Sequence, residues 1–295
     1  MSQSMKLVKL HRPFIPAVVA GILAIAQFAC AQEPANRVTV PLSDPSRPAT
    51  VRAHLLTGSI TVKAYDGKEI IVEANPRGSD EESRPGHRHV VGSKDDASTE
   101  GLKRIPVNST GLSIEAENNQ VRISTDSMRR AVDLTITVPV HTSLSLHTVN
   151  SGNISVTGVD GELDINNVNG EVTLTNVSGS AVAHALNGHV RATFNRIDQK
   201  PMAFSSMNGN IDVTFPASLK ANLSMRTDNG EVFSDFDVKL EPTAPQQTVE
   251  DGRPHGGTYR VKVDKTVRGT INGGGPEIQF KNFNGNIYIR KAGGK

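Results

Sequence analysis

The feature that most constrains this chain is a repeat of nine residues, which runs without interruption from Asn150 to Phe194. Each unit begins at a turn that contains glycine. In the strand that follows, the second and fourth residues after the glycine are aliphatic and their neighbours are mostly polar. This alternation predicts strands with one buried face. Because no helical pattern separates the units, the short period is typical of stacked β-coils that bury their apolar sides against one another. The turn glycines are Gly152, Gly161, Gly170, Gly179 and Gly188.

Two geometries fit this period. Asn-Gly is a favoured hairpin turn, so an antiparallel β-meander or sandwich would give the same spacing. However, Asn-Gly recurs only at every second unit, at Asn169 and Asn187, and then at slightly longer intervals at Asn208 and Asn229. In a parallel β-helix or β-solenoid with about two short strands per coil of 18–21 residues, these asparagines form one column, in which stacked side-chain amides can hydrogen-bond. The sequence therefore favours the solenoid.

A solenoid of this kind has columns of aliphatic side chains inside it, one residue from each coil. Two such columns are predicted from the glycine spacing. The first contains Ile154, Val172, Val190, Ile211 and Val232, and the second contains Val156, Leu174, Ala192 and Val213.

Residues 1–31 have the order of a secretory signal peptide that is removed. Basic residues precede an apolar stretch from Phe14 to Phe28, which ends at small residues. That stretch is shorter than the ~20 apolar residues of a membrane-spanning helix. A lipid-modified Cys30 is the alternative. Because Cys30 is the only cysteine, its removal excludes disulfides, thiolate metal sites and a cysteine nucleophile.

The expected mature chain has a Pro-rich lead-in at 32–50, a single β-solenoid domain at 51–290 and a flexible tail at 291–295. Two segments without apolar alternation interrupt the domain. We expect a mobile charged insertion at 75–106 and a Pro/Gln-rich loop at 241–257. Three of the 32 basic residues and none of the 30 acidic ones precede the lead-in, so the mature chain is nearly neutral and has no basic patch for nucleic acid.

Four stretches together resemble a bacterial putative-adhesin domain family of otherwise unknown function. They are the opening L-L-T-G-S-I-T-V-K-A, the run D-L-T-I-T-V-P-V-H-T-S-L-S-L, the repeated V-N-G-E-V-T-L units and the closing P-E-I-Q-F-K-N-F-N-G-N-I-Y-I, which span Val51 to Arg290. The resemblance implies a right-handed β-helix-like fold at the cell envelope. It supplies no catalytic residues.

The nine-residue repeat and the histidines raise the question of metal binding. Calcium-binding β-rolls also repeat every nine residues, but they need G-G-x-G-x-D, in which glycines and an aspartate supply oxygen ligands. Here each turn has one glycine, and only Asp160 is an acidic turn residue. His87 and His89 lie in the charged insertion, and His184 and His189 flank a turn at polar positions. Surface histidines are expected rather than a metal site, and no cofactor is predicted.

A pair of carboxylates could act as a catalytic acid and base. Glu162 and Asp164 are expected on one outer face, with Glu171 at the equivalent place one strand later. An acid/base pair needs a cleft that shifts its pKa values, whereas solvated positions of a repeat are normally polar. We therefore predict no catalytic residues and a protein that is not an enzyme.

The sequence thus predicts an exported, non-enzymatic envelope β-solenoid in the periplasm or at the cell surface, an adhesin or scaffold. Its partner would be an envelope or cell-surface protein or polysaccharide, and it would be neither nucleic acid-binding nor integral to the membrane. Two alternatives stay open. One is a β-helical enzyme that acts on an envelope polysaccharide, and the other is a periplasmic accessory or stress-response component.

Overall fold

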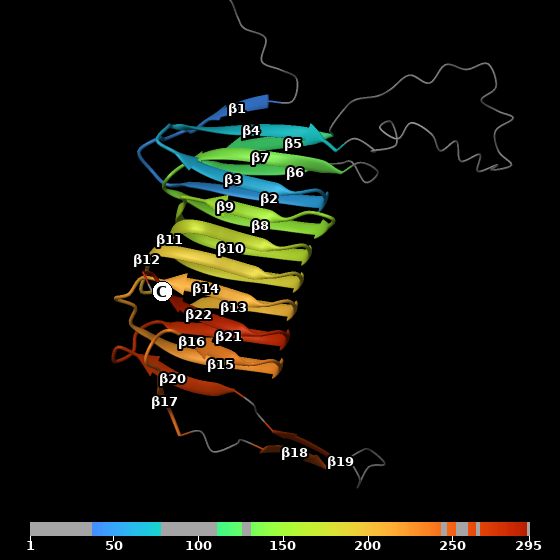
Figure 1. Cartoon of the computed structure of the whole chain (residues 1–295). Helices are drawn as coiled ribbons and strands as arrows, with labels where there is room; N and C mark the ends of the chain where they lie inside the picture. Colours follow the sequence, from blue (N-terminus) through green and yellow to red (C-terminus); the bar gives the residue numbers. More distant parts are fainter. Residues whose placement is uncertain are drawn as a thin grey trace, which may run out of the picture. The chain divides into compact units, whose positions relative to one another are not determined.

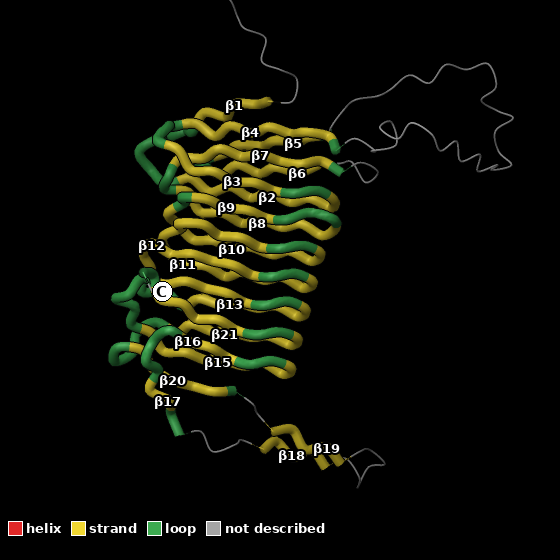
Figure 2. The backbone as a smooth tube through the Cα atoms, in the orientation of Figure 1, coloured by secondary structure: helices red, strands yellow, loops and turns green. Residues whose placement is uncertain are grey.

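The computed structural model describes six segments of strands and turns (Figures 1 and 2). These residues contain no helix, and hence none long and apolar enough to cross a membrane. The predicted signal peptide and most of the predicted charged insertion lie outside the described residues. The segments are 37–77, 111–125, 131–242, 247–251, 259–263 and 266–293.

Twenty of the described strands belong to one hydrogen-bonded sheet, which folds into two faces around a shared interior (Figure 1). We name the faces after β8 and β9. In spatial order, the β8 face consists of β5 (Leu112–Glu117), β6 (Gln120–Thr125), β2 (Ala49–Thr57), β8 (Thr142–Asn150), β10 (Asp160–Asn169), the second part of β11 (Val172–Asn187), β13 (Met202–Asn208), β21 (Glu277–Asn284), β15 (Ala221–Asn229), β20 (Val267–Ile271) and β17 (Lys239–Leu240).

The β9 face continues the same coils on the other side of the interior. In spatial order it consists of β1 (Arg37–Pro41), β4 (Glu69–Pro76), β7 (Val132–Pro139), β3 (Ile60–Tyr65), β9 (Ile154–Thr157), the first part of β11, β12 (Val190–Ile197), β14 (Ile211–Phe215), β22 (Ile287–Lys291) and β16 (Val232–Ser234).

The strand pairing is that of a parallel β-solenoid. Val172 of β11 pairs in parallel with Ile154 of β9, 18 residues earlier, and each coil contributes one strand to each face. Antiparallel pairs in the described sheet occur only toward its ends, between β1 and β4, β4 and β7, β5 and β6, β15 and β20, and β17 and β20. The predicted β-solenoid is confirmed, and an antiparallel meander does not describe the coils.

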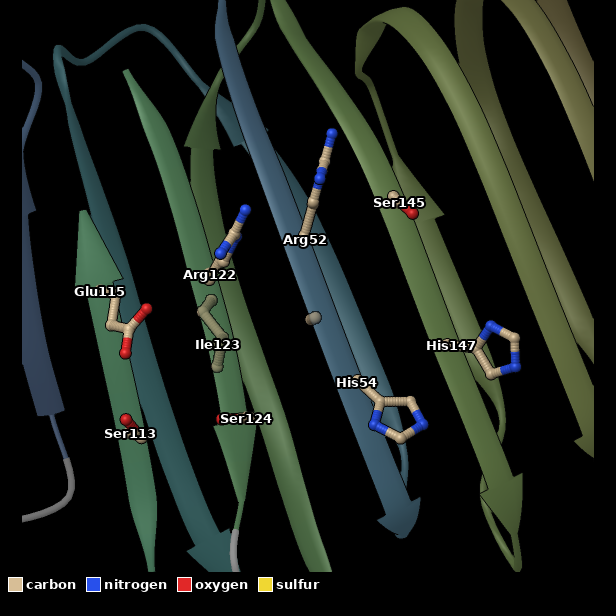
Figure 3. Close-up of a pocket in the computed structure, with 10 residues that line it drawn as sticks. Arg52, His54, Ser113, Glu115, Arg122, Ile123, Ser124, Ser145 and His147 are labelled. Atoms are coloured by element: carbon tan, nitrogen blue, oxygen red, sulfur yellow. The ribbon is translucent and has the colours of Figure 1, made fainter. Parts of the chain in front are cut away.

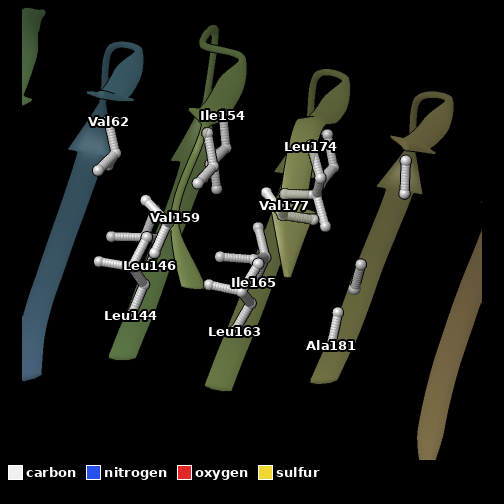
Figure 4. Close-up of a cluster of buried hydrophobic side chains, with 14 of the residues drawn as sticks. Val62, Leu144, Leu146, Ile154, Val159, Leu163, Ile165, Leu174, Val177 and Ala181 are labelled. Carbon is white, nitrogen blue, oxygen red and sulfur yellow. The ribbon is translucent and has the colours of Figure 1, made fainter. Parts of the chain in front are cut away.

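Both faces point their aliphatic side chains into the interior (Figure 4). The second predicted column and the first four members of the first are buried, each at most 3% exposed. Val232 is an exception, because it is 38% exposed. Toward the last coils the core becomes aromatic: the rings of Phe194 and Phe215 stack with centroids 5.5 Å apart, as do those of Phe204 and Phe280. Burial of these side chains supplies the main stabilising term.

The asparagines form the predicted column at the edge between the two faces. Each side-chain amide donates to the carbonyl of the asparagine in the neighbouring coil. The Nδ2–Oδ1 distances are 3.4 Å for Asn169 to Asn150, 3.0 Å for Asn187 to Asn169, 2.8 Å for Asn208 to Asn187, 2.8 Å for Asn284 to Asn208 and 2.9 Å for Asn229 to Asn284. These amides therefore hydrogen-bond along the stack, parallel to the backbone bonds between strands.

The coils do not stack in the order of the sequence. The coil of β2 and β3 is inserted between later parts of the chain. On the β8 face, β2 lies between β6 and β8, and on the β9 face, β3 lies between β7 and β9. Likewise, the coil of β21 and β22 lies between that of β13 and β14 and that of β15 and β16. Asn284 accordingly separates Asn208 from Asn229 in the column. The strand that carries Val232 becomes terminal on its face, which explains its exposure.

Strands occupy part of both segments that were predicted to interrupt the domain. β4 extends to Pro76, inside the predicted charged insertion, and the next residue, Arg77, forms an ion pair of 2.6 Å with Asp133. In the predicted Pro/Gln-rich loop, β18 (Gln247–Asp251) forms an antiparallel hairpin with β19 (Tyr259–Val263).

Candidate functional site

Two columns of outward side chains cross the strands of the β8 face. They follow from the register, because Arg52 is the Cα partner of Arg122 and of Ser145, while His54 is the partner of Ser124 and of His147. Successive outward positions of a strand lie two residues apart, so the columns run side by side. The first contains Arg122, Arg52, Ser145 and Asp164, and the second contains Ser124, His54, His147, Asn166 and His184.

These columns border an open groove over β5, β6, β2 and β8, with a volume of about 400 Å³. Figure 3 shows its polar side chains, which come from strands that are far apart in the sequence. Besides the arginines and histidines, the groove has three hydroxyl groups, those of Ser113, Ser124 and Ser145, and one carboxylate, that of Glu115. The groove is therefore rich in hydrogen-bonding groups and carries more positive than negative charge.

The two arginines are the most unusual charges in the groove. Arg52 and Arg122 lie directly opposite each other on neighbouring strands, and both are exposed. In the described part of the chain, neither guanidinium forms an ion pair, not even with Glu115, whereas six other arginines there do. Like charges directly opposite each other destabilise a sheet. An anion bound between them would relieve this repulsion and accept charge-assisted hydrogen bonds.

The histidines of the second column differ in their partners. The rings of His54 and His147 contact each other edge to face, with centroids 5.5 Å apart. His184 lies farther along the column, where its Nδ1 is 2.6 Å from Ser205 Oγ. Partial burial, and secondarily the positive charge of His147, lower the pKa of His184 below its usual value. His189 instead accepts a hydrogen bond of 2.8 Å from the backbone amide of Asn210 at the turn.

The carboxylates considered from the sequence do not form an acid/base pair. Glu162 and Asp164 line one hollow on the β8 face, but Glu162 forms an ion pair with Lys200. Glu171 immediately precedes the first part of β11 on the other face, and it pairs with Arg191 at 2.6 Å. The three acids are therefore divided between two faces, and one carboxylate of the pair on the β8 face is neutralised by a lysine.

The acidic turn residue Asp160 is also committed to protein partners. Its carboxylate pairs with Arg196 at 2.6 Å and with His141 at 3.3 Å. A carboxylate that is committed to an arginine and a histidine of the protein does not suit a calcium ligand. Among the described residues, no group of three or more His, Cys, Asp or Glu side chains is placed to hold a metal ion.

Sequence reasoning missed the groove because its residues come from segments that it did not align. Arg52 and His54 belong to the opening strand, and His147 to the strand before the regular repeats. A signal was present, since Ile60 obeys the same glycine spacing as Ile154 and pairs with it. Alignment of those two coils on their glycines would have placed His54 one residue away from His147, because β2 pairs with β8 at an offset of 93 residues whereas the glycines are 94 residues apart.

Known proteins resemble this chain to different degrees. Among curated proteins there is no match. A crystal structure of a putative cell adhesion protein from Clostridium sporogenes is similar, with 10% identity, a TM-score of 0.41 and coverage of 86% of this chain and 98% of that one. A putative adhesin from Bacteroides fragilis has 11% identity and a TM-score of 0.38, with coverage of 86% and 95%.

A family model gives the stronger result. The model described as Toastrack DUF4097 matches residues 112–272, more than half of the 295 residues. This range holds most of the parallel coils and five of the six asparagines of the column, all except Asn284. The chain belongs to the Toastrack DUF4097 family.

Proposed function

We propose that this chain is an exported, non-enzymatic binding protein of the cell envelope, an adhesin or scaffold, and that the groove on its β8 face binds an acidic polysaccharide. Export is supported by residues 1–31, whose basic, apolar and small residues follow the order of a signal peptide. Removal of this segment would leave a mature chain from Gln32 onward, with the solenoid domain at 51–290.

The observation that carries the proposal is the pair of Arg52 and Arg122, which face each other and form no ion pair among the described residues. A planar guanidinium suits carboxylate, phosphate or sulfate groups, which it can bind through two parallel hydrogen bonds. The serine hydroxyls beside the pair match the donors and acceptors of sugar hydroxyls. An open groove on a long polar face also suits an extended polymer better than a small enclosed ligand.

The remaining observations favour binding over catalysis. Hydrolysis of a polysaccharide by two carboxylates requires an acid and a base at a set separation across the scissile bond. The groove contains one carboxylate, Glu115. The neighbouring hollow contains Glu162 and Asp164, but Glu162 is paired with Lys200. This arrangement supports ligand binding better than an acid/base pair.

Cosedimentation of the purified chain with envelope polysaccharide tests the proposal. The double variant Arg52→Ala/Arg122→Ala should lose most of the bound fraction, and added salt should weaken binding by the unaltered chain. The matched control is Arg191→Ala/Arg290→Ala, which removes two ion-paired arginines from the β9 face and should bind normally. All variants should keep the β-rich circular dichroism spectrum. Undiminished binding by the groove variant, or equal loss in the control, would contradict the assignment of the groove.

A further inference from the structure

His54 and His147 form a pair that the anion-binding proposal does not use. They lie opposite each other on the parallel strands β2 and β8, and both are exposed. Their ring centroids are 5.5 Å apart and the ring planes meet at 61°. Figure 3 shows the two imidazoles on neighbouring strands among the residues that line the groove.

These two imidazoles have no hydrogen-bond or ion-pair partner in the part of the chain that the structure describes. The other three described histidines do have partners: His184 contacts Ser205, His189 accepts from Asn210, and His141 pairs with Asp160. The ring nitrogens of His54 and His147 are therefore available, and they are held close together by the strand register rather than by a flexible loop.

The separation of the rings matches that of two imidazoles on one metal ion. A metal–nitrogen distance of about 2.0–2.1 Å places the ion roughly 3.2 Å from each ring centre. Two rings at a tetrahedral angle then have centres about 5.2 Å apart, close to the observed 5.5 Å. Small rotations of exposed side chains are enough to direct one nitrogen of each ring at the ion.

We propose that His54 and His147 together bind a divalent transition-metal ion. Imidazole ligands suit Zn²⁺, Ni²⁺ and Cu²⁺, whereas Ca²⁺ and Mg²⁺ prefer oxygen. Two protein ligands leave coordination positions for water or for an oxygen atom of a bound ligand. Formation of the site does not require the acidic polysaccharide, because both protein ligands are imidazoles of this chain and water can occupy the remaining positions.

Binding must fall as the pH decreases, since neutral imidazole is the ligand and protons compete with the metal. Charged neighbours change the affinity for the metal ion: nearby arginines weaken binding of a cation, and nearby carboxylates strengthen it. The charged and titratable groups around the pair are Arg52 on β2, Glu115 on β5, Arg122 on β6, Asp164 on β10 and His184 on β11.

Titration of the full tag-free chain with Zn²⁺ in a calorimeter tests the site. One equivalent of Zn²⁺ should bind saturably, and both His54→Ala and His147→Ala should lose this binding. His184→Ala and His189→Ala are matched controls, because each removes a histidine that is committed to a protein partner, and both should keep it. The double variant His87→Ala/His89→Ala covers the other histidine pair noted in the sequence and should also keep it.

Absence of saturable Zn²⁺ binding, equal binding by His54→Ala, or loss only in His87→Ala/His89→Ala would overturn the proposal. The result does not depend on the envelope ligand. A chain that binds Zn²⁺ but no polysaccharide would refute the proposed function and support the metal site. A chain that binds polysaccharide but no Zn²⁺ would refute the metal site and support the proposed function.

Discussion

The glycines at the asparagine edge are required by the close approach of successive coils. A Cβ atom built on Gly188 would lie 2.0 Å from the carbonyl oxygen of Gly170, and one built on Gly209 would lie 2.2 Å from that of Gly188. The contact is with backbone, so neither coil can yield without disturbing its strand hydrogen bonds. The spacing of glycines in the sequence is thus a steric requirement of stacking as well as a turn preference.

Gly188→Ala tests this requirement. Gly188 does not have the positive φ of Gly170 or Gly209, so the substitution adds a steric clash without conformational strain at the residue itself. We expect a loss of roughly 1–3 kcal/mol or more in the free energy of unfolding, the usual cost of overpacking. Denaturant unfolding measures it. An unchanged midpoint would mean that the coils are farther apart than described.

The inward and outward positions of a strand should also differ sharply. Val172 is fully buried in its column, whereas the next residue, Thr173, points outward and is partly exposed. Val172→Asp should destabilise the fold by several kcal/mol, because it buries a carboxylate without a partner. Thr173→Asp should cost about 0.5 kcal/mol or less. Equal losses for the two variants would refute this assignment of faces.

His184 predicts a small dependence of stability on pH. Its pKa is lowered in the folded chain, chiefly by partial burial, so the unfolded chain binds the proton more tightly. Stability should therefore decrease as the pH falls below the usual histidine value of 6.5 toward the lower folded pKa, and be fully present above it. Comparison of melting temperatures across this range, with His184→Gln as reference, measures the effect. The same slope in the variant would assign the effect to other groups.

At the scale of elements, the repeat predicts the coils but not their order. The spacing of glycine and aliphatic residues was enough to predict parallel strands, the buried columns and the asparagine column. It was not enough to predict that β21 and β22 insert between earlier coils. Asn284-Gly285 has the same turn residues as the other units, so each coil offers nearly the same edge to any neighbour. The prediction that Val232 lies in the core was wrong because β22 takes the place beside β14, which leaves β16 as the last strand of its face.

The inserted last coil should therefore be essential to the end of the stack. A chain truncated after Gly275 lacks β21 and β22, which pair with four strands of the neighbouring coils. We expect loss of cooperative unfolding and rapid proteolysis between β13 and β16, because buried residues such as Phe204 lose their cover. Removal of only residues 293–295 is the control. A truncated chain that melts like the control would mean that the insertion of this coil is wrong.

At the scale of the whole molecule, the insertion of the first coil builds the candidate site. Arg52 and His54 on β2 meet Arg122 on one side and His147 on the other only because β2 lies between β6 and β8. If the coils followed sequence order, these side chains would not be neighbours. This is why the sequence predicted a polar outer face in general but neither the arginine pair nor the histidine pair.

The most direct test of the account is hydroxyl-radical footprinting of the chain with and without bound envelope polysaccharide. The account predicts that oxidation of His54 and His147 decreases on binding, because they border the groove on the β8 face. Met207 and Phe283 at the asparagine edge, and Tyr288 on the β9 face, should be oxidised equally in both samples. Protection of these three residues without protection of the histidines would place the binding surface elsewhere and contradict the central claim.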